Sequence, residues 1–327
     1  MKSAFVTGGT GFIGSHLVEM LLSKGYRVKC LIRKTSSLEW LKNLPVEYVY
    51  GDLFTSDALQ TAVREVEYVY HLAGVVAAKN RDGYFRGNQE GTRNILEAVL
   101  TSNPGLKKFI FVSSLTAVGP SLGDDPVTEG TVPHPITAYG ESKLAAEREV
   151  MDRWSTIPAV IIRAPAVYGP RDIGILTFFQ TINKGLEPLI GFHEKKASLV
   201  HSTDLVNGII LAAENEKAVR TSYFIGSERG YTWSELGALT SRLLNKKTIK
   251  IKIPHWIIFA IAGISGAVGN LGKRPPIFNF EKGKDITRPN WTCSIEKAKR
   301  ELGYKPTITV EQGFWETIKW YKQQGWL

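Results

Sequence analysis

AFVTGGTGFIG, residues 4–14, is the stretch that decides the fold of this 327-residue chain. The apolar run Ala4–Val6 leads into glycines spaced as Gly8-x-x-Gly11-x-x-Gly14, after which apolar residues recur with a helical period. A strand, a glycine-rich turn and a helix in this order are typical of a dinucleotide pyrophosphate site, where glycines permit a tight turn and close approach of the backbone. The N–H groups at the helix start complete such a site. We therefore expect cofactor contacts from Gly8, Thr10, Gly11, Phe12, Ile13 and Gly14.

The end of the second predicted strand, residues 28–32, indicates which dinucleotide binds. A carboxylate at this place would hold a ribose 2′-hydroxyl, but here Arg33 and Lys34 follow the strand. A guanidinium can bind a 2′-phosphate through two hydrogen bonds, whereas a carboxylate would repel it. NADP(H) is therefore favoured as the cofactor, with NAD(H) as the alternative. The other interpretation of Arg33 and Lys34 is that they are ordinary solvated loop cations.

Asp52 and Leu53 end the third predicted strand and allow two interpretations. Asp52 could accept a hydrogen bond from an adenine amino group while Leu53 covers the ring. Equally, Asp52 could cap a helix that begins near Ser56. One carboxylate does not decide between these two roles.

A serine and a tyrosine–lysine pair follow the glycine motif in the chain. Ser114 ends the buried strand predicted over residues 108–112, and the carboxyl ends of parallel strands are where such sheets present ligands. Tyr139 and Lys143 are spaced as Tyr-x-x-x-Lys among good helix formers, so both side chains share one helix face. Each motif is weak alone, but their common order and spacing indicate one catalytic site.

These three residue types suit proton transfer during hydride exchange. A phenol has a pKa near 10 and is a poor base at neutral pH. We expect the ammonium of Lys143 and an oxidised nicotinamide to lower the pKa of Tyr139, which then accepts or donates a proton. Ser114 would hold the substrate oxygen by a hydrogen bond as charge develops there. Lys143 would also bind the nicotinamide ribose, and Tyr139 is expected to contact the cofactor as well.

The chain resembles the extended short-chain dehydrogenase/reductase superfamily, also called NAD-dependent epimerase/dehydratases. The matching segments are Thr7–Gly14 (TGGTGFIG), Asp52-Leu53, His71–Gly74 (HLAG), Phe111–Gly119 (FVSSLTAVG), Tyr139–Lys143 (YGESK), Arg163–Pro170 (RAPAVYGP) and Lys297–Pro306 (KAKRELGYKP). The resemblance implies that Ser114, Tyr139 and Lys143 are catalytic. It also implies a homodimer and a cofactor site lined by Leu72, Ala73, Gly74, Pro165 and Val167.

Within this superfamily the chain is more similar to one branch than to another. Sugar-nucleotide epimerases usually carry a diphosphate-binding arginine where this chain has Ala197, and an acid where it has Arg33. The segments Val28–Ser36 and Ser113–Gly119 look more like the dihydroflavonol-reductase and 3β-hydroxysteroid-dehydrogenase branch. That branch acts on apolar alcohols and ketones.

Predicted strands alternate with predicted helices along the chain. Strand-like runs lie at 4–6, 28–32, 46–50, 67–72, 108–112 and 159–163, and helical stretches lie at 13–24, 88–101 and 138–154. This alternation predicts an α/β fold with a Rossmann, doubly wound parallel sheet. By resemblance, residues 1–169 and 199–226 form the NADP-binding domain, with 198–200 and 223–225 as strands that return to it. A smaller, discontinuous C-terminal region, residues 170–198 and 227–327, would bind the substrate.

The stretch 256–272 (WIIFAIAGISGAVGNLG) contains no formal charge. It is shorter than the 20 or so residues of a membrane-spanning helix and holds four glycines, so we do not expect it to span a membrane. Lys250, Lys252, Lys273 and Arg274 flank it. Three interpretations remain: an ordinary buried helix, an apolar lid over a hydrophobic substrate, and a helix that contacts a membrane surface.

The composition is that of a soluble globular protein, with 43% hydrophobic residues. Two cysteines far apart in the chain and the early start of the glycine motif favour reduced thiols and a cytoplasmic location. The net charge of +10 is dispersed and accompanies no recognition motif, so we expect no nucleic-acid partner. No metal-binding residues are predicted.

The sequence therefore predicts an NADP(H)-dependent oxidoreductase that exchanges hydride with a secondary alcohol or ketone of a largely hydrophobic molecule. One alternative is a nucleotide-sugar epimerase or dehydratase that retains NAD. An alternative of another class is a non-catalytic NADP(H)-sensing protein, since a fold does not fix a function. A sensor does not need a group that transfers protons, so the presence of Ser114, Tyr139 and Lys143 together argues against this alternative.

Overall fold

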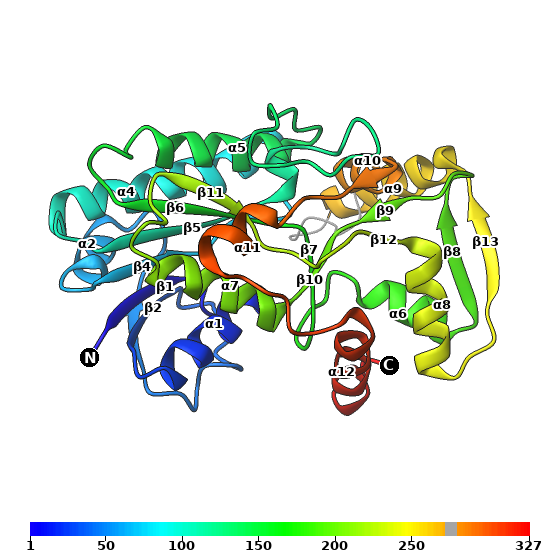
Figure 1. Ribbon diagram of the computed structural model, residues 1–327, viewed down its shortest axis with the longest axis horizontal. Helices are drawn as coiled ribbons and strands as arrows, with labels where there is room; N and C mark the ends of the chain where they lie inside the picture. Colours follow the sequence, from blue (N-terminus) through cyan, green and yellow to red (C-terminus); the bar gives the residue numbers. More distant parts are fainter. Residues whose placement is uncertain (272–279) are drawn as a thin grey trace.

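The computed structural model describes residues 1–271 and 280–327, with the backbone alone for 266–271. Its centre is a seven-stranded sheet in the order β11-β6-β5-β4-β1-β2-β3, in which every pairing is parallel (Figure 1). The strands are β1 Ser3–Thr7, β2 Arg27–Ile32, β3 Val46–Tyr50, β4 Tyr68–His71, β5 Lys108–Ser114, β6 Ala159–Ala164 and β11 Thr221–Phe224. The strand order reverses between β1 and β4, so ligands are expected at the carboxyl ends of these two strands. The predicted Rossmann sheet is confirmed.

Helices cover both faces of this sheet because its buried strands are apolar on both sides. In β1, Ala4 and Val6 pack on one face with helices α1, α7 and α11, while Phe5 packs on the other with α2, α4 and α5 (Figure 1). The helices of the first face are α1 Phe12–Ser23, α7 Ser202–Glu214 and α11 Glu296–Leu302, and those of the second are α2 Ser56–Val63, α4 Gly91–Ser102 and α5 Ala138–Met151. The predicted helices at 13–24 and 138–154 therefore exist with slightly shifted ends.

One predicted helix is built in two pieces. The stretch expected at 88–101 follows α3 (Arg81–Phe85) and begins with a π-helical turn, Arg86–Glu90, before α4 continues it. A π-helical turn inserts an extra residue per turn and often marks a functional site. Here it presents Asn88 toward the centre of the molecule, where that side chain is buried.

Of the two strands expected to return to the NADP-binding domain, one pairs with the main sheet and the other with a separate strand. Thr221–Phe224 (β11) pairs with β6, but Leu199–His201 (β10) pairs with β7, Ala166–Tyr168, in a separate two-stranded sheet. Pro165 stands between β6 and β7 and has no N–H to donate, so the ladder of the main sheet ends at Ala164. The chain then leaves the sheet and pairs elsewhere.

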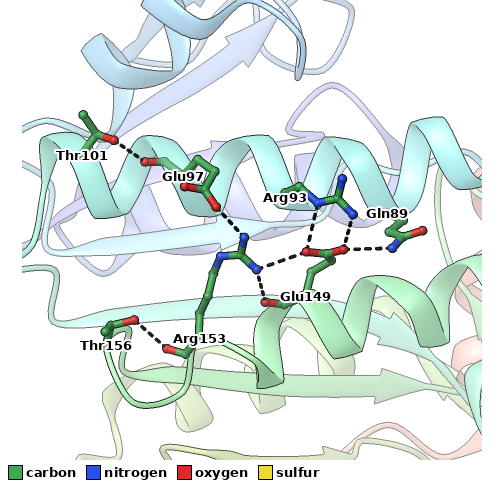
Figure 2. Close-up of polar contacts among 7 residues, drawn as sticks. All are labelled: Gln89, Arg93, Glu97, Thr101, Glu149, Arg153 and Thr156. Atoms are coloured by element: carbon green, nitrogen blue, oxygen red, sulfur yellow. Dashed lines mark hydrogen bonds and ion pairs between the residues drawn. The ribbon is translucent and has the colours of Figure 1, made fainter.

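Helices α4 and α5 are fastened together by an ionic network on their outer side (Figure 2). The carboxylate of Glu149 on α5 accepts hydrogen bonds from Arg93 at 2.6 Å, Gln89 at 2.9 Å and Arg153 at 3.1 Å. Arg153 also pairs with Glu97 of α4. The network holds the helix that carries the predicted Tyr-x-x-x-Lys motif against its neighbour.

The remaining elements form the smaller part of the molecule, at the end away from the N-terminus (Figure 1). Aromatic and aliphatic side chains of α6, α8 and α12 form its core around Phe179 and Phe314. A short sheet of β12, β9 and β14 lies between this core and the main sheet, and β13 pairs with β8. The elements are α6 Leu176–Asn183, β8 Leu186–Ile190, β9 Lys196–Ala197, β12 Tyr231–Thr232, α8 Trp233–Leu244, β13 Ile249–Ile253, β14 Asn290–Trp291 and α12 Val310–Gln323.

The uncharged stretch at 256–272 forms most of helix α9, His255–Leu271, which packs against α10, Phe280–Thr287. Trp256 and Ile264 are 70% and 68% exposed, whereas Ile258 and Ala262 are buried. The interpretation as an ordinary buried helix is therefore wrong for 255–265, because one side of this part faces outward. The flanking residues 272–274 lie outside the described residues. No helix in the described parts of the chain is long and apolar enough to cross a bilayer.

Candidate active site

The glycine loop between β1 and α1 is closed by contacts from backbone to backbone. Gly8 has φ +75°, and a Cβ on it would lie 2.8 Å from the backbone nitrogen of Ala73. A Cβ on Gly14 would lie 2.1 Å from the carbonyl oxygen of Gly8. Gly11 donates its N–H to that same carbonyl at 3.0 Å. The loop thus needs glycine at both ends, and it turns its backbone toward the carboxyl ends of β1 and β4.

A cavity of about 380 Å³ lies against this loop and has the lining expected of a dinucleotide site. Nine of the predicted cofactor residues line it: Gly8, Thr10, Gly11, Arg33, Asp52, Leu53, Leu72, Ala73 and Gly74. Phe12, Ile13 and Gly14 lie directly behind the loop in α1. Lining residues that the sequence patterns do not indicate are Leu31, Ser36, Gly51, Phe54, Val75 and Gly87.

Five further predicted cofactor residues do not line this cavity: Lys34, Tyr139, Lys143, Pro165 and Val167. Lys34 is exposed beside Arg33 and does not line the cavity. Pro165 lines a second cavity, described below, and Val167 packs against the hydrophobic core beneath α1 and α7. Arg33 is exposed, and no carboxylate in the described residues pairs with it. Of the two cations that follow β2, only Arg33 lines the cavity.

Asp52 fixes a turn at the edge of the first cavity. Its Oδ1 accepts hydrogen bonds from the N–H of Phe54 at 2.8 Å and from the hydroxyl of Thr55 at 2.9 Å. Thr55, not Asp52, is the N-cap of α2. Asp52 therefore shapes the turn that precedes the helix rather than capping the helix, and an adenine contact by Asp52 stays a prediction.

Ser114 and Tyr139 meet in the second cavity. Ser114 ends β5, and its Oγ accepts hydrogen bonds from the N–H of Thr116 at 3.2 Å and the hydroxyl of Thr116 at 2.9 Å. Because both are accepted bonds, Thr116 does not use the hydroxyl proton of Ser114, which is available to Tyr139, whose pKa a hydrogen bond with Ser114 lowers. Tyr139 lies in the first turn of α5, whose N-cap Thr137 accepts a hydrogen bond from Gly140 at 3.1 Å. The sequence motifs did not indicate the part that Thr116 plays.

The protein's own groups raise the pKa of Tyr139 instead of lowering it. Burial is the largest cause and brings the pKa to about 12; a hydrogen bond with Ser114 lowers it, while the nearby charge of Asp285 raises it. Lys143 contributes no lowering: its Nζ donates to the carbonyl of Val112 at 2.8 Å. The lowered pKa expected for Tyr139 is therefore not found among the protein's own groups.

Lys143 is buried, and its ammonium lies close to the first cavity. Burial lowers its pKa to about 8, against a raising effect of Glu147, and its Nζ lies 4.4 Å from the centroid of the Phe111 ring. The same Nζ lies 3.9 Å from where a Cβ on Gly74 would stand. Since Gly74 lines the first cavity, Lys143 is close to the place where a nicotinamide ribose is expected.

Asn88, in the π-helical turn, ties these parts together. Its Oδ1 accepts a hydrogen bond from the N–H of Val75 at 2.7 Å, and its Nδ2 donates to the carbonyl of Val75 at 3.0 Å and to Ser142 at 2.8 Å. Val75 lines the first cavity and Val76 lines the second. Asn88 therefore fixes the backbone between the two cavities to α5. No motif in the sequence pointed to it.

The second cavity measures about 430 Å³ and is mostly apolar. Its polar groups near the reacting hydroxyls come from Ser114, Thr116, Tyr139 and Asp285. Apolar and aromatic lining residues come from segments far apart in the chain: Val76, Tyr84, Leu115, Pro165, Ile175, Phe178, Trp233, Ile286 and Trp291. A larger cavity, of about 550 Å³, is lined by Asp124 and Arg229 among other residues. None of the predicted site residues lines it.

Fold and cavities together define an enzyme of the dinucleotide-binding α/β class. The model of the NAD dependent epimerase/dehydratase family matches residues 4–226. The chain is 30% identical over 322 residues to a ceramide reductase of Caulobacter vibrioides, covering 98% of this chain and 95% of that protein. The chain therefore belongs to the NAD-dependent epimerase/dehydratase family, within the extended short-chain dehydrogenase/reductase superfamily.

Other similar proteins come from the predicted branch. A putative dihydroflavonol 4-reductase of Synechocystis is 29% identical over 335 residues, covering 99% of this chain and 95% of that protein. A 3-beta-hydroxysteroid dehydrogenase of Mycolicibacterium neoaurum is 27% identical over 338 residues, covering 97% and 90%. The crystal structure of gox2253 is 27% identical, with a TM-score of 0.83 and 100% of both chains covered. The predicted resemblance is confirmed.

Proposed function

We propose that this protein is an NADP(H)-dependent oxidoreductase that transfers hydride between the cofactor and a secondary alcohol or ketone of a largely hydrophobic molecule. One observation carries this proposal: the hydroxyls of Ser114 and Tyr139 face an apolar cavity that adjoins the glycine-loop cavity at Val75 and Val76. A carbonyl held by these hydroxyls would lie beside the cofactor.

The residues present fit a nicotinamide dinucleotide at the glycine loop, where a side chain on Gly8 or Gly14 would fill the cradle. When bound, that cofactor supplies or accepts the hydride. The high pKa of Tyr139 keeps its phenol protonated at neutral pH, so the phenol serves as the proton donor in the reductive direction. Carbonyl, hydride and the Tyr139 proton then give the alcohol, and the phenolate takes up a proton from water.

Ser114 and Lys143 complete the proposed mechanism. The hydroxyl proton of Ser114, which Thr116 does not use, is donated to the substrate oxygen when substrate binds, and this hydrogen bond strengthens as negative charge develops there. Lys143, beside Gly74, holds the nicotinamide ribose through its ammonium.

Two observations support the finer parts of the proposal. The mostly apolar second cavity suits a hydrophobic substrate, and the names of relatives refer to ceramide, dihydroflavonol and a hydroxysteroid. Arg33 at the end of β2 lines the first cavity without a carboxylate partner in the described residues, which favours the 2′-phosphate of NADP(H).

The first experiment is a titration of the purified protein with NADPH and NADH, followed by nicotinamide fluorescence, and then a screen of apolar ketones for NADPH oxidation. Tyr139→Phe should lower turnover by about 10²- to 10⁴-fold while the Kd for NADPH stays unchanged, because only the proton donor is lost. Tyr26→Phe, which removes a phenol that bonds Glu214 far from both cavities, is the matched control. Retained activity in Tyr139→Phe would exclude the assignment.

A second candidate is a sugar-nucleotide epimerase, favoured by one observation. Arg288 and Lys196 line the second cavity and could hold a diphosphate. Against it, Lys195 uses its ammonium on the carbonyls of Thr287 and Arg288, and Ala197 occupies the place where the resemblance puts a diphosphate arginine. Denaturing the purified protein decides: a stoichiometric, non-exchanging NAD in the supernatant supports the epimerase, and an exchangeable site supports the reductase.

A further inference from the structure

One face of the two-stranded sheet of β8 and β13 is apolar and partly open to solvent. Glu187 of β8 faces α8, since a Cβ on Gly237 would lie 2.6 Å from its carboxylate, and Lys250 of β13 pairs with it at 3.7 Å. Successive residues of a strand point to opposite faces, so the residues between these lie on the other side. That side consists of six apolar residues: Leu186, Pro188, Ile190, Ile249, Ile251 and Ile253. Ile249 and Ile251 are exposed.

Helix α9 continues this apolar surface. It begins at His255, two residues after β13 ends, and a Cβ on Gly191 in the turn after β8 would lie 2.5 Å from the His255 ring. From Trp256 to Ser265 the exposed residues recur with a helical period, and all of them are uncharged: Trp256, Ala260, Ile261, Gly263 and Ile264. A surface helix of a soluble protein normally turns charged side chains toward water. The outward face of α9 therefore has the composition of a contact surface.

The described side chains of α9 do not cover the substrate cavity. None of the residues 255–265 lines it, whereas Asp285 and Ile286 of α10 do. Gly283 of α10 lies against Phe259 and Ala262, on the buried side of α9. Helix α10 thus stands between α9 and the cavity, so the exposed face of α9 points away from the substrate and not toward it.

Positive charge accompanies this surface. Residues 236–265 contain five lysines and arginines and no aspartate or glutamate, so the excess positive charge of the chain is not spread evenly. Lys246, Lys247 and Lys252 are exposed, and none of the three forms an ion pair within the described residues. Apolar side chains bordered by free cations are typical of a protein surface that lies on an anionic bilayer.

We propose that the outward faces of β13 and α9 dock on a lipid bilayer that carries anionic headgroups. The docking surface consists of Ile249, Ile251, Trp256, Ile261 and Ile264 with the border of Lys246, Lys247 and Lys252. The apolar side chains enter the boundary between headgroups and acyl chains, and the lysines bind the headgroup phosphates. Trp256 suits that boundary because its ring is apolar and its indole N–H is polar. The inference concerns where the protein binds and does not depend on the reaction that it catalyses.

The charge of the docking surface argues against a second copy of the chain as its partner. In a twofold dimer the same surface meets itself, so the lysines of both copies would approach one another. Residues 236–265 supply no carboxylate to separate them, and like charges across an interface are costly. An anionic bilayer supplies the opposite charge over the whole surface.

The test is flotation of the purified full chain with vesicles of phosphatidylcholine, either alone or with about one-third phosphatidylglycerol. We expect binding to the mixed vesicles that weakens as salt is added. Trp256→Gln with Ile264→Gln should lower the partition coefficient by at least about tenfold, because two apolar side chains no longer leave water. Trp315→Gln with Leu211→Gln is the matched control, since both side chains are exposed on α12 and α7, outside the docking surface.

A second set of variants tests the cationic border. Replacing Lys246, Lys247 and Lys252 by Gln should lower binding to the mixed vesicles by about fivefold for each lysine. The same three substitutions should leave binding to pure phosphatidylcholine unchanged. The matched control removes three exposed lysines from the other part of the molecule: Lys42, Lys217 and Lys305. It should bind like the wild type.

Brominated acyl chains, which quench tryptophan fluorescence on contact, separate insertion from adhesion to the headgroups. Trp256→Phe keeps an apolar ring, so it should bind the mixed vesicles as the wild type does. It should nevertheless lose most of the quenching, because Trp256 is the tryptophan placed in the docking surface. Equal quenching of the wild type and Trp256→Phe would mean that another face of the protein enters the lipid, and would overturn the proposal.

Thermal unfolding and the oligomeric state complete the test. All substituted side chains are exposed, so every variant should unfold within a few degrees of the wild type. If one set unfolds early, the other set and Trp256→Phe decide. Absence of binding to the mixed vesicles, or equal binding of surface and control variants, would overturn the proposal. A wild-type dimer that Trp256→Gln with Ile264→Gln converts to a monomer, without vesicle binding, would assign the surface to a second copy instead.

Discussion

The two cavities of this protein are built in different ways. The cofactor cavity owes its shape to the backbone: Gly8 and Gly14 are in contact with main-chain atoms, and their motif spans seven residues. The substrate cavity is lined by side chains from segments between Val76 and Trp291, which only the folded chain brings together. A backbone cradle accepts one ligand shape, whereas a wall of side chains can change residue by residue. We therefore expect local sequence to set the choice of cofactor and tertiary structure to set the choice of substrate.

The largest effect on ligand binding is expected from a substitution that changes the cofactor cavity alone. Gly14→Ala would place a Cβ 2.1 Å from the carbonyl oxygen of Gly8, so the loop must move away from its phosphate-binding position. We expect the Kd for NADPH to rise by about 100-fold or more, which corresponds to about 3 kcal/mol, because the displaced backbone N–H groups no longer meet the phosphates. The measurement is a fluorescence titration, with Gly105→Ala as control since nothing lies within 4 Å of its Cβ position. Unchanged affinity would mean that the loop does not bind the cofactor.

Reversing the charge of Arg33 tests whether the cofactor cavity selects NADPH over NADH. Arg33→Asp should lower the preference for NADPH over NADH by about 10- to 100-fold, which corresponds to the loss of a charged hydrogen bond. Lys34→Asp is the matched control because Lys34 does not line the cavity. The ratio of the two dissociation constants is the quantity to compare. Equal effects of both substitutions would indicate a general charge effect instead of a specific contact.

The unfolding free energy should depend on pH through Asp285, which lines the second cavity. Burial raises the pKa of Asp285 to about 6, so the folded state binds this proton more tightly than the unfolded chain does, whose carboxyl has an ordinary pKa near 4. The stabilising effect of this proton is complete below pH 4 and is lost as the pH rises to about 6. Relative to the wild type, Asp285→Asn should therefore gain about 1–3 kcal/mol of unfolding free energy between pH 4 and pH 7. Urea unfolding at both pH values measures it, and a constant difference would contradict the raised pKa.

The smallest effect is expected outside both cavities. Glu149→Gln weakens the ionic network between α4 and α5, whose partners are partly exposed, so the unfolding free energy should fall by only about 1 kcal/mol. The Kd for NADPH should stay the same, because Glu149 lines neither cavity. A change in cofactor affinity would show that the network positions Lys143 through α5.

The same contrast explains what could be predicted from the sequence. The glycine loop, Ser114, Tyr139 and Lys143 lie in short motifs next to predicted strands and helices, and the structure brings them together at one edge of the sheet. Arg33 and Lys34 look alike in sequence, but neighbouring residues at the end of a strand point to opposite sides, and only Arg33 lines the cavity.

Other features of the site depend on tertiary contacts that no local pattern carries. Asn88 reaches Val75 and Ser142 through an irregular helical turn, and Asp285 meets Tyr139 across 146 positions of sequence. The pKa of Tyr139 moves opposite to the expected direction because burial outweighs the charges that the motif suggests. Burial of this kind is a property of the assembled fold.

The position of β11 at the edge of the main sheet has a consequence for synthesis on the ribosome. Strand β6 ends at Ala164, but its outer neighbour begins at Thr221, after the chain has built part of the smaller region. Until that strand leaves the ribosome, β6 presents an open hydrogen-bonding edge on which nascent chains can associate. The buried carboxylate of Asp204 obtains its donors, Thr307 and Ile308, later still. Nascent chains from which Thr221–Phe224 has not yet left the ribosome are therefore the ones that should need a chaperone.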